Sequence, residues 1–124
     1  MIDTHSHIYD PDFDSDRVEV INRAIEAGVE KVLLANVDTS TLEPMLQCHE
    51  QYPDFTSIAI GLHPTSVKDD WQIELRNIED ALRSNNNCLS IGEIGLDLYW
   101  DKTFISQQEK ALEQQLDWAI SLDL

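Results

Sequence analysis

The feature that most constrains the fold of this chain is a pattern that occurs four times. Each occurrence is a short apolar run followed by an amphipathic helical segment. Three of the runs are almost continuously apolar, as expected for strands that are buried on both faces. Strands that alternate with helices are parallel and are joined by right-handed crossovers. The chain is therefore predicted to be an α/β protein with strands at "MIDTH", "KVLLANV", "SIAIGLH" and "LSIGEIG".

The helical segments are recognised by apolar residues that recur at helical spacing. The first has Ser15 as a candidate N-cap and Gly28 as a candidate C-terminal stop. Pro44 is expected in the first turn of the second helix, because proline lacks the N–H that later turns need. The four predicted apolar stripes are Val18, Ile21 and Ile25; Leu42, Met45, Leu46 and His49; Trp71, Leu75, Ile78 and Leu82; and Ile105, Leu112, Leu116 and Ile120.

Length and composition bound the possible functions. The chain has 124 residues, of which 42% are hydrophobic and 26% charged, and it has no low-complexity linker, so we expect one domain. The net charge of −16 argues against general electrostatic attraction to nucleic acid or to an anionic membrane. It does not exclude an enzyme acting on nucleic acid, because bound divalent cations invert the local field.

We expect a cytoplasmic protein that does not enter a membrane. No stretch has the pattern of a secretory signal, and none is apolar over the length needed to span a bilayer. Cys48 and Cys88 are too far apart to form a Cys-x-x-Cys pair, and we interpret them as reduced, partly buried thiols.

Four strand–helix units in a row fit two architectures. One is an open, doubly wound sheet, and the other is half of an eight-stranded barrel, which needs roughly 250 residues when complete. Periodicity alone does not separate them. In both, chemistry gathers at the carboxyl ends of the strands, and all four runs here end in polar residues: His5 and His7, Asn36 and Asp38, His63, and Glu93.

The first run points to a metal site. Residues two apart on a strand share a face, so His5 and His7 project together, as two ligands of one cation can. Imidazole nitrogen suits zinc, iron or nickel, whereas carboxylate oxygen suits harder cations. Asp3 lies on the same face, one step deeper, where it could hold a ring nitrogen. Glu93 arrives from another strand, and its two oxygens could bridge two metals.

Several of these residues also have simpler interpretations. His49 lies on the apolar face of a helix and is read as partly buried and structural. His63 serves equally well as a cap of the turn that follows it. Asp97 fits a turn or helix cap as well as a place in the site. Tyr99 and Trp100 are read as packing residues, the commoner fate of aromatic side chains.

The segments "IDTHSH", "GLHP" and "GEIGLDLYW", in this order and spacing, resemble the TatD family of metal-dependent deoxyribonucleases in the amidohydrolase superfamily. The resemblance runs over residues 1–124. It implies a TIM-barrel-type (β/α)₈ fold, of which this chain supplies about four βα units. It also implies two divalent metal ions, such as Mg, Zn or Mn. His5 and His7 would bind the first of them. Glu93 would reach both metals as the catalytic residue.

The resemblance further implies a substrate and some supporting residues. The expected activity is cleavage of phosphodiester bonds in DNA by metal-activated water. The alternatives are a D-aminoacyl-tRNA deacylase or another amidohydrolase, and an inactive module that binds a metal or a partner. His63 matches a family position near the site that is not usually a ligand, and we also expect Asp3 and Asp97 around the metals or against the substrate.

One departure from the family concerns length. The family is about twice as long, and its later ligands, two histidines and an aspartate, have no counterpart here. We therefore expect residues 1–124 to be the N-terminal half of a single barrel domain. Alone, this half is expected to be inactive and to associate with itself through its open strand edges.

Overall fold

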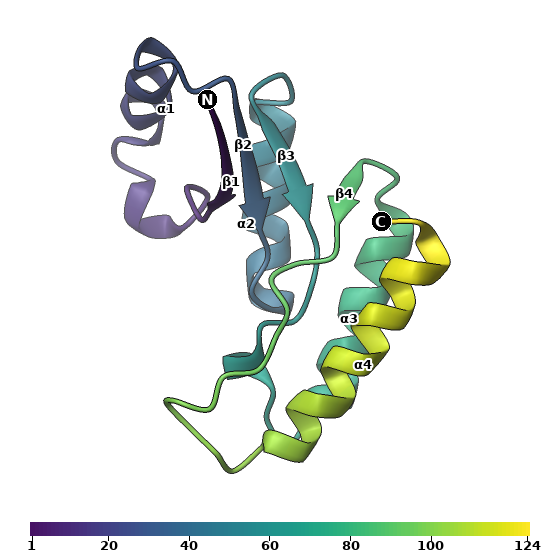
Figure 1. Cartoon of the computed structure of the whole chain (residues 1–124). Helices are drawn as coiled ribbons and strands as arrows, with labels where there is room; N and C mark the ends of the chain where they lie inside the picture. Colours follow the sequence, from purple (N-terminus) through teal and green to yellow (C-terminus); the bar gives the residue numbers. More distant parts are fainter.

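The computed structural model describes residues 1–124 as one parallel four-stranded sheet with four α-helices (Figure 1). The strands are β1 (Ile2–Ser6), β2 (Lys31–Ala35), β3 (Thr56–Ala59) and β4 (Cys88–Ser90). The helices are α1 (Arg17–Glu26), α2 (Thr39–Gln51), α3 (Trp71–Ser84) and α4 (Ile105–Leu122), with short 3₁₀ turns η1 (Pro11–Phe13) and η2 (Pro64–Ser66). No helix combines the length and the apolar character needed to cross a membrane.

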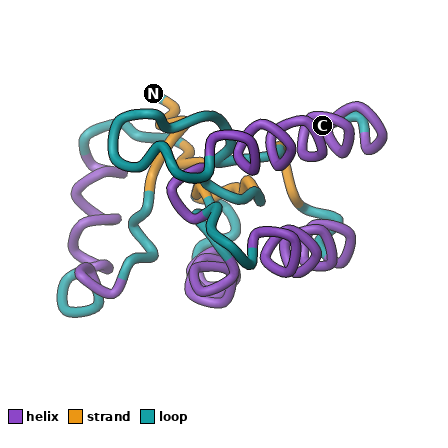
Figure 2. The backbone as a smooth tube through the Cα atoms, turned by 90° about the horizontal axis from the view of Figure 1, so that it is seen from below, coloured by secondary structure: helices purple, strands orange, loops and turns teal.

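The strand order decides between the two predicted architectures. The order is β1-β2-β3-β4, so each strand pairs with its neighbour in sequence. A doubly wound sheet reverses its strand order at a switch point, and no reversal occurs here. Helices α2, α3 and α4 follow one another around the strands, and Figure 2 shows the helices as an arc about the sheet. This is the arrangement of one side of a (β/α)₈ barrel.

The core lies between the sheet and the helices α2 and α3. Val32 and Leu34 of β2 and Ile58 of β3 are buried there, and Met45 of α2 packs in the same cluster. The stripe predicted for the third helix is confirmed at its centre, since Leu75, Ile78 and Leu82 are all buried. The burial on both faces that we expected for these strands is only partly observed, because β2 alternates between buried and partly exposed residues and Leu89 of β4 is 61% exposed.

The predicted starts of the first two helices are wrong. Helix α1 begins after Asp16 and not after Ser15, because the Arg17 side chain binds the carbonyl oxygens of Ile8 and Tyr9 and so fixes the first turn. Helix α2 begins at Thr39, where Asp38 and Thr41 form a capping box. Pro44 is therefore inside the helix, and the carbonyl that it leaves unbonded, four residues earlier, belongs to the exposed Ser40.

The stripe predicted for α4 is also wrong. Its buried residues are Gln108, Ala111, Gln115 and Trp118, while Leu116 and Ile120 are 48% and 80% exposed. The buried face is set by two amides that bind backbone. Gln115 Oε1 accepts the Leu62 N–H at 2.6 Å, and Gln115 Nε2 donates to the Leu62 carbonyl at 3.3 Å. Polar bonds to the loops at the strand ends thus decide which side of α4 faces inward.

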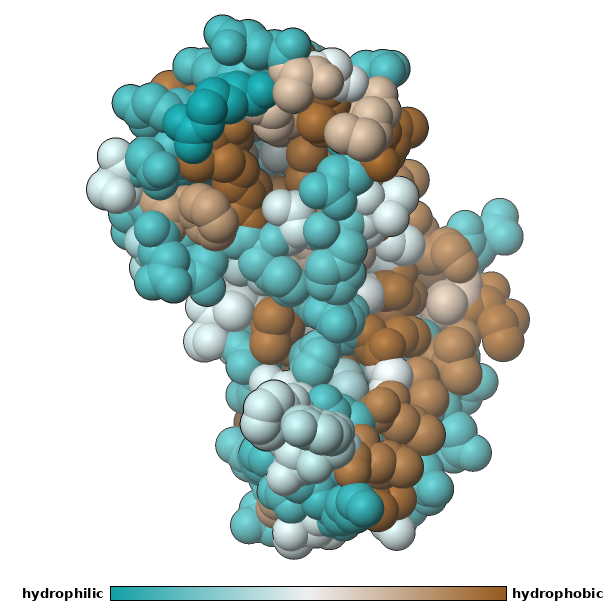
Figure 3. Space-filling model, turned by 60° about the vertical axis from the view of Figure 1, so that its left-hand side comes forward, coloured by the Kyte–Doolittle hydropathy of each residue, from teal (hydrophilic) through white to brown (hydrophobic).

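Apolar side chains reach the surface on several elements. Val18 and Ile25 of α1 are about half exposed, and Tyr99 and Trp100 are 82% and 77% exposed, so neither aromatic is the packing residue that we expected. Figure 3 shows hydrophobic side chains gathered in patches on one face of the molecule. The other large exposed apolar residues include Met1, Ile2, Ile73, Leu89, Leu96 and Leu98.

Replacing Gln115 with alanine is expected to destabilise the fold by about 1–3 kcal/mol, because the buried N–H and C=O of Leu62 lose their partners. The neighbouring Gln114→Ala variant is the matched control, since Gln114 is exposed and surface changes stay within about 0.5 kcal/mol. Urea denaturation of both variants measures the difference. Equal midpoints would show that the Gln115 amide does not support the loop.

Candidate metal centre

Four side chains meet at the carboxyl edge of the sheet. His5 lies in β1 and His7 directly after it, His63 follows β3 at the start of η2, and Glu93 lies three residues beyond the end of β4. Parallel strands end at the same edge, so residues far apart in sequence come together there. The sequence prediction that the strand ends converge holds for these four residues.

Backbone contacts place Glu93 next to the histidines. The Glu93 N–H donates to the Asn36 carbonyl at 2.9 Å, and the Gly92 N–H donates to the Ile60 carbonyl at 3.2 Å. The segment after β4 therefore crosses the end of β3 to reach the end of β2. Gly61 permits this crossing, because a Cβ there would lie 2.8–3.0 Å from atoms of Gly92 and Ile94.

Asn36 has a structural role at this edge. Its side chain is fully buried, and its Oδ1 accepts the Gly61 N–H at 3.3 Å. Its Nδ2 donates to the Asp38 carbonyl and to Thr41 Oγ1, both at 2.7 Å. The Asn36 side chain thus links the end of β2 to the start of α2 and to the segment after β3. Its hydrogen bonds do not involve the histidines.

Three ligand atoms are close enough to share one cation. His5 Nε2 lies 3.0 Å from His7 Nε2, and Glu93 Oε2 lies 3.2 Å from the first and 3.6 Å from the second. Ligand atoms bonded at 2.0–2.2 Å to one ion are about 3–3.5 Å apart. The side chains of His5, His7 and Glu93 are each 30–52% exposed, so solvent and a substrate can reach them. The donor set of two imidazoles and one carboxylate fits a divalent metal.

His63 contacts the other oxygen of Glu93. Its Nδ1 accepts the Thr65 N–H at 3.1 Å, so the predicted turn cap is confirmed. A nitrogen that accepts carries no proton, which places the ring proton on Nε2. That nitrogen lies 3.3 Å from Glu93 Oε1. His63 therefore orients the Glu93 carboxylate, whose Oε2 is left facing His5 and His7.

Tyr9 is a residue that the sequence reasoning missed. Its ring is buried, and its hydroxyl lies 2.9 Å from His7 Nδ1 and 2.5 Å from the Ala35 carbonyl oxygen. Burial raises the pKa of Tyr9 to about 12, so the hydroxyl keeps its proton at physiological pH. The sequence feature that could have pointed to Tyr9 is its spacing. Tyr9 stands two residues after His7, just as His7 stands two residues after His5.

Asp3 and Asp97 have other contacts than those predicted. The Asp3 carboxylate accepts the backbone N–H of His5 at 3.0 Å and does not hold a ring nitrogen. Asp97 Oδ1 accepts the N–H groups of Tyr99 and Trp100, and its own backbone is bonded to the side chain of Gln108. The turn interpretation of Asp97 is therefore confirmed. His49 is structural as expected, with its Nδ1 2.9 Å from Thr56 Oγ1.

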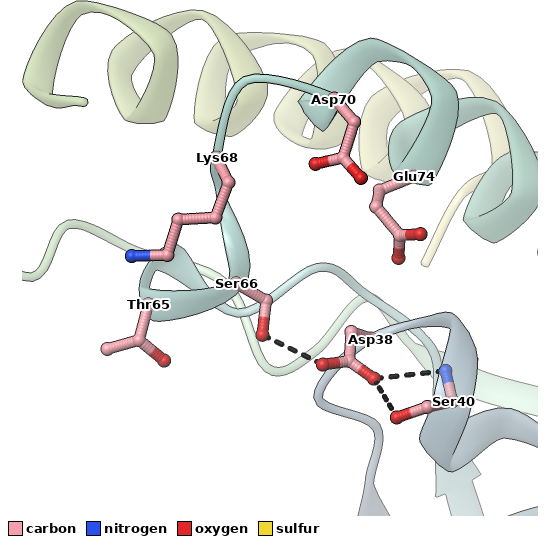
Figure 4. A pocket seen from close by; sticks show the side chains of 7 residues that line it. All are labelled: Asp38, Ser40, Thr65, Ser66, Lys68, Asp70 and Glu74. Atoms are coloured by element: carbon pink, nitrogen blue, oxygen red, sulfur yellow. Dashed lines mark hydrogen bonds between the residues drawn. The ribbon is translucent and has the colours of Figure 1, made fainter.

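The largest surface pocket lies elsewhere. It has a volume of about 400 Å³ and is formed at the N-terminal ends of α2, η2 and α3 (Figure 4). Its Asp38 is occupied by bonds from Ser40 and Ser66, and its Glu74 accepts the Thr39 N–H. The pocket contains none of the three clustered candidate ligands, and two of its acidic groups, Asp38 and Glu74, bind backbone N–H groups at the start of α2.

Comparisons with known proteins find relatives along the whole chain. The family described as TatD related DNase matches residues 2–124. The chain is 33% identical over its full length to the uncharacterized metal-dependent hydrolase YabD of Bacillus subtilis, and 30% identical to the 3′-5′ ssDNA/RNA exonuclease TatD of Pantoea ananatis. The crystal structure of YjjV, a TatD homolog from Escherichia coli, matches the whole chain with a TM-score of 0.89 at 32% identity.

These matches cover only part of each relative. The chain spans 48% of YabD, 47% of the Pantoea exonuclease and 48% of the YjjV chain, so it is about half as long as the relatives that it matches. In each case the coverage of the present chain is complete. The four strand–helix units and the three candidate metal ligands, His5, His7 and Glu93, therefore lie within the matched part of each relative.

Proposed function

Because this chain belongs to the TatD-related DNase family, we propose that the intact protein is a metal-dependent hydrolase that cleaves phosphodiester bonds of DNA. The observation that carries the proposal is the cluster of His5 Nε2, His7 Nε2 and Glu93 Oε2 at ligand spacing. Relatives named as a metal-dependent hydrolase and as an ssDNA/RNA exonuclease support the reaction class and the substrate class. Residues 1–124 would supply the N-terminal half of one barrel domain.

Each residue has a separate task in this proposal. His5 and His7 would offer their Nε2 lone pairs to one divalent cation, and Glu93 would offer Oε2. When bound, the metal supplies Lewis acidity, which makes water nucleophilic near neutral pH and offsets the charge that develops on the phosphate. His63 holds Glu93 Oε1, which keeps the carboxylate in one orientation. We also propose a second metal, which Glu93 would reach through Oε1, the oxygen that contacts His63 in the present structure.

Two further properties complete the proposal. We place the protein in the cytoplasm, which agrees with the two free cysteines, Cys48 and Cys88, both buried. Burial raises the pKa of both thiols, which keeps them protonated and unreactive. Association of the isolated half through exposed apolar residues such as Leu89 and Ile120 remains part of the proposal.

One alternative keeps the same centre and changes the bond. An ester on a charged tRNA could be hydrolysed at the same ligands, because the Lewis acid serves either acyl or phosphoryl transfer. A second alternative is a module without activity that binds metal or a protein. Nothing in the geometry of His5, His7 and Glu93 favours either over the nuclease, whereas the relatives' names favour a nuclease.

A substrate comparison with the intact protein tests the function. We expect nucleotides to be released from a 3′-labelled single-stranded DNA in the presence of Mg²⁺, Mn²⁺ or Zn²⁺. Chelation with EDTA should abolish the release, and added metal should restore it. A D-aminoacyl-tRNA, assayed in parallel for release of the amino acid, should remain intact. Deacylation without DNA cleavage would support the first alternative, and metal binding without either reaction would support the second.

A further inference from the structure

The hydroxyl of Tyr9 connects a candidate metal ligand to the next strand. The residue is 3% exposed, and its ring meets the His7 ring edge to face, with centroids 5.7 Å apart. The hydroxyl oxygen lies 2.9 Å from His7 Nδ1 and 2.5 Å from the carbonyl oxygen of Ala35, the last residue of β2. Both contacts are within hydrogen-bond distance.

The direction of the two hydrogen bonds follows from the chemistry of the partners. A carbonyl oxygen only accepts, so the single hydroxyl proton of Tyr9 must point at Ala35. The tyrosine then has only lone pairs to offer to His7. A contact between that oxygen and Nδ1 is favourable only if Nδ1 carries a proton and donates it.

The tautomer of His7 is thereby fixed. A neutral imidazole has one N–H, so a proton on Nδ1 leaves Nε2 with its lone pair. This is the nitrogen that lies 3.0 Å from His5 Nε2 and 3.6 Å from Glu93 Oε2. A metal ligand must present a lone pair, and the opposite tautomer of His7 would present a proton at this point.

We propose that Tyr9 is a positioning residue of the metal centre: it holds His7 in the Nδ1–H tautomer and anchors the ring to the backbone of β2. The inference rests on the proposed function only in taking His7 as a ligand. The ligand class that the arrangement serves is a divalent cation that accepts imidazole nitrogen, such as Zn²⁺. Loss of an outer partner of a ligating histidine typically weakens metal binding by 10- to 100-fold.

The test is calorimetric titration of Zn²⁺ into the metal-free intact protein. Tyr9→Phe removes the hydroxyl and keeps the ring, and we expect its dissociation constant for Zn²⁺ to rise about 10- to 100-fold. Tyr52→Phe is the matched control: Tyr52 also packs against the core, but its hydrogen bonds involve its backbone only. Its affinity for Zn²⁺ should equal that of the unmodified protein.

Nitrogen NMR of the His7 ring provides a second, independent readout. In the metal-free protein at a pH where the ring is neutral, Nδ1 should be protonated, and Tyr9→Phe should convert it to a mixture of tautomers. Unchanged affinity in a folded Tyr9→Phe variant would overturn the proposal, as would an Nε2–H tautomer in the unmodified protein. If the unmodified protein bound no metal, the proposed function would fail, while the tautomer measurement would still decide the role of Tyr9.

Discussion

Replacement of Glu93 by glutamine is expected to reduce metal-dependent DNA hydrolysis by more than about 100-fold, since loss of even an outer partner of a metal ligand costs 10- to 100-fold. Glu93 Oε2 is the only carboxylate oxygen in the cluster with His5 and His7. The amide keeps the size of the side chain but removes the negative charge that would balance a bound cation. The measurements are kcat/KM on a labelled oligonucleotide and bound metal per protein.

The matched control for this prediction is Glu109→Gln. Glu109 is an exposed residue of α4, so the substitution changes net charge equally and should leave the rate unchanged. Full activity with normal metal content in Glu93→Gln would remove Glu93 from the proposed ligand set. A loss of activity with normal metal affinity would instead indicate that Glu93 acts on the substrate.

Gly61→Ala is expected to have the second largest effect, through the position of Glu93. A Cβ at residue 61 would lie 2.8 Å from Ile94 Cγ2 and 2.9 Å from the backbone carbon of Gly92. Since backbone must move to relieve the contact, the overpacking should cost about 1–3 kcal/mol of stability. Displacement of the segment that carries Glu93 should lower hydrolysis by about 10- to 100-fold, because small misplacements of reacting groups are costly.

Gly92→Ala is the comparison that isolates this mechanism. Gly92 belongs to the same segment, but a Cβ there meets only the Ala59 Cβ, at 3.4 Å, and no backbone. Thermal unfolding and DNA hydrolysis of the two variants should differ clearly, with Gly61→Ala the more impaired in both. Equal behaviour would mean that the close approach at Gly61 does not position Glu93.

The parts of the site that sequence reasoning found are those governed by strand parity and strand ends. His5 and His7 share a face because they are two residues apart, and Glu93 reaches them because parallel strands end at one edge. Tyr9 stands two residues beyond His7 but lies in the turn after β1, and its role depends on the Ala35 carbonyl, 26 residues away. Spacing along the chain cannot reveal a bond between neighbouring strands whose pairing is not yet known.

The errors in the helices have a different physical cause. Hydrophobic periodicity assumes that the buried face of a helix is the apolar one. In α4 the buried face includes Gln108 and Gln115, because their amides bind backbone that no strand or helix partner satisfies. For α2, the capping box at Asp38 set the start and placed Pro44 inside the helix.

Hydrophobic periodicity also could not decide between the doubly wound sheet and the barrel. The same four strand–helix units can be ordered as a doubly wound sheet or as part of a barrel, and their apolar patterns are alike. The observed order β1-β2-β3-β4 distinguishes the two, and the resemblance to the TatD family predicted the same outcome. Motifs that carry chemistry were here more informative about topology than hydrophobicity was.

The order of the strands, in which each pairs with its neighbour in sequence, affects when the sheet can form during synthesis of the chain. Each strand pairs with the one made just before it, so the sheet can be assembled progressively while the ribosome is still extending the chain. The three candidate metal ligands cannot be brought together as early, because at about 5–20 residues per second Glu93 is synthesised roughly 4 to 18 seconds after His5. During that interval His5 and His7, at the end of the first strand to be made, lack the carboxylate of Glu93, so the proposed centre would be completed late in biosynthesis.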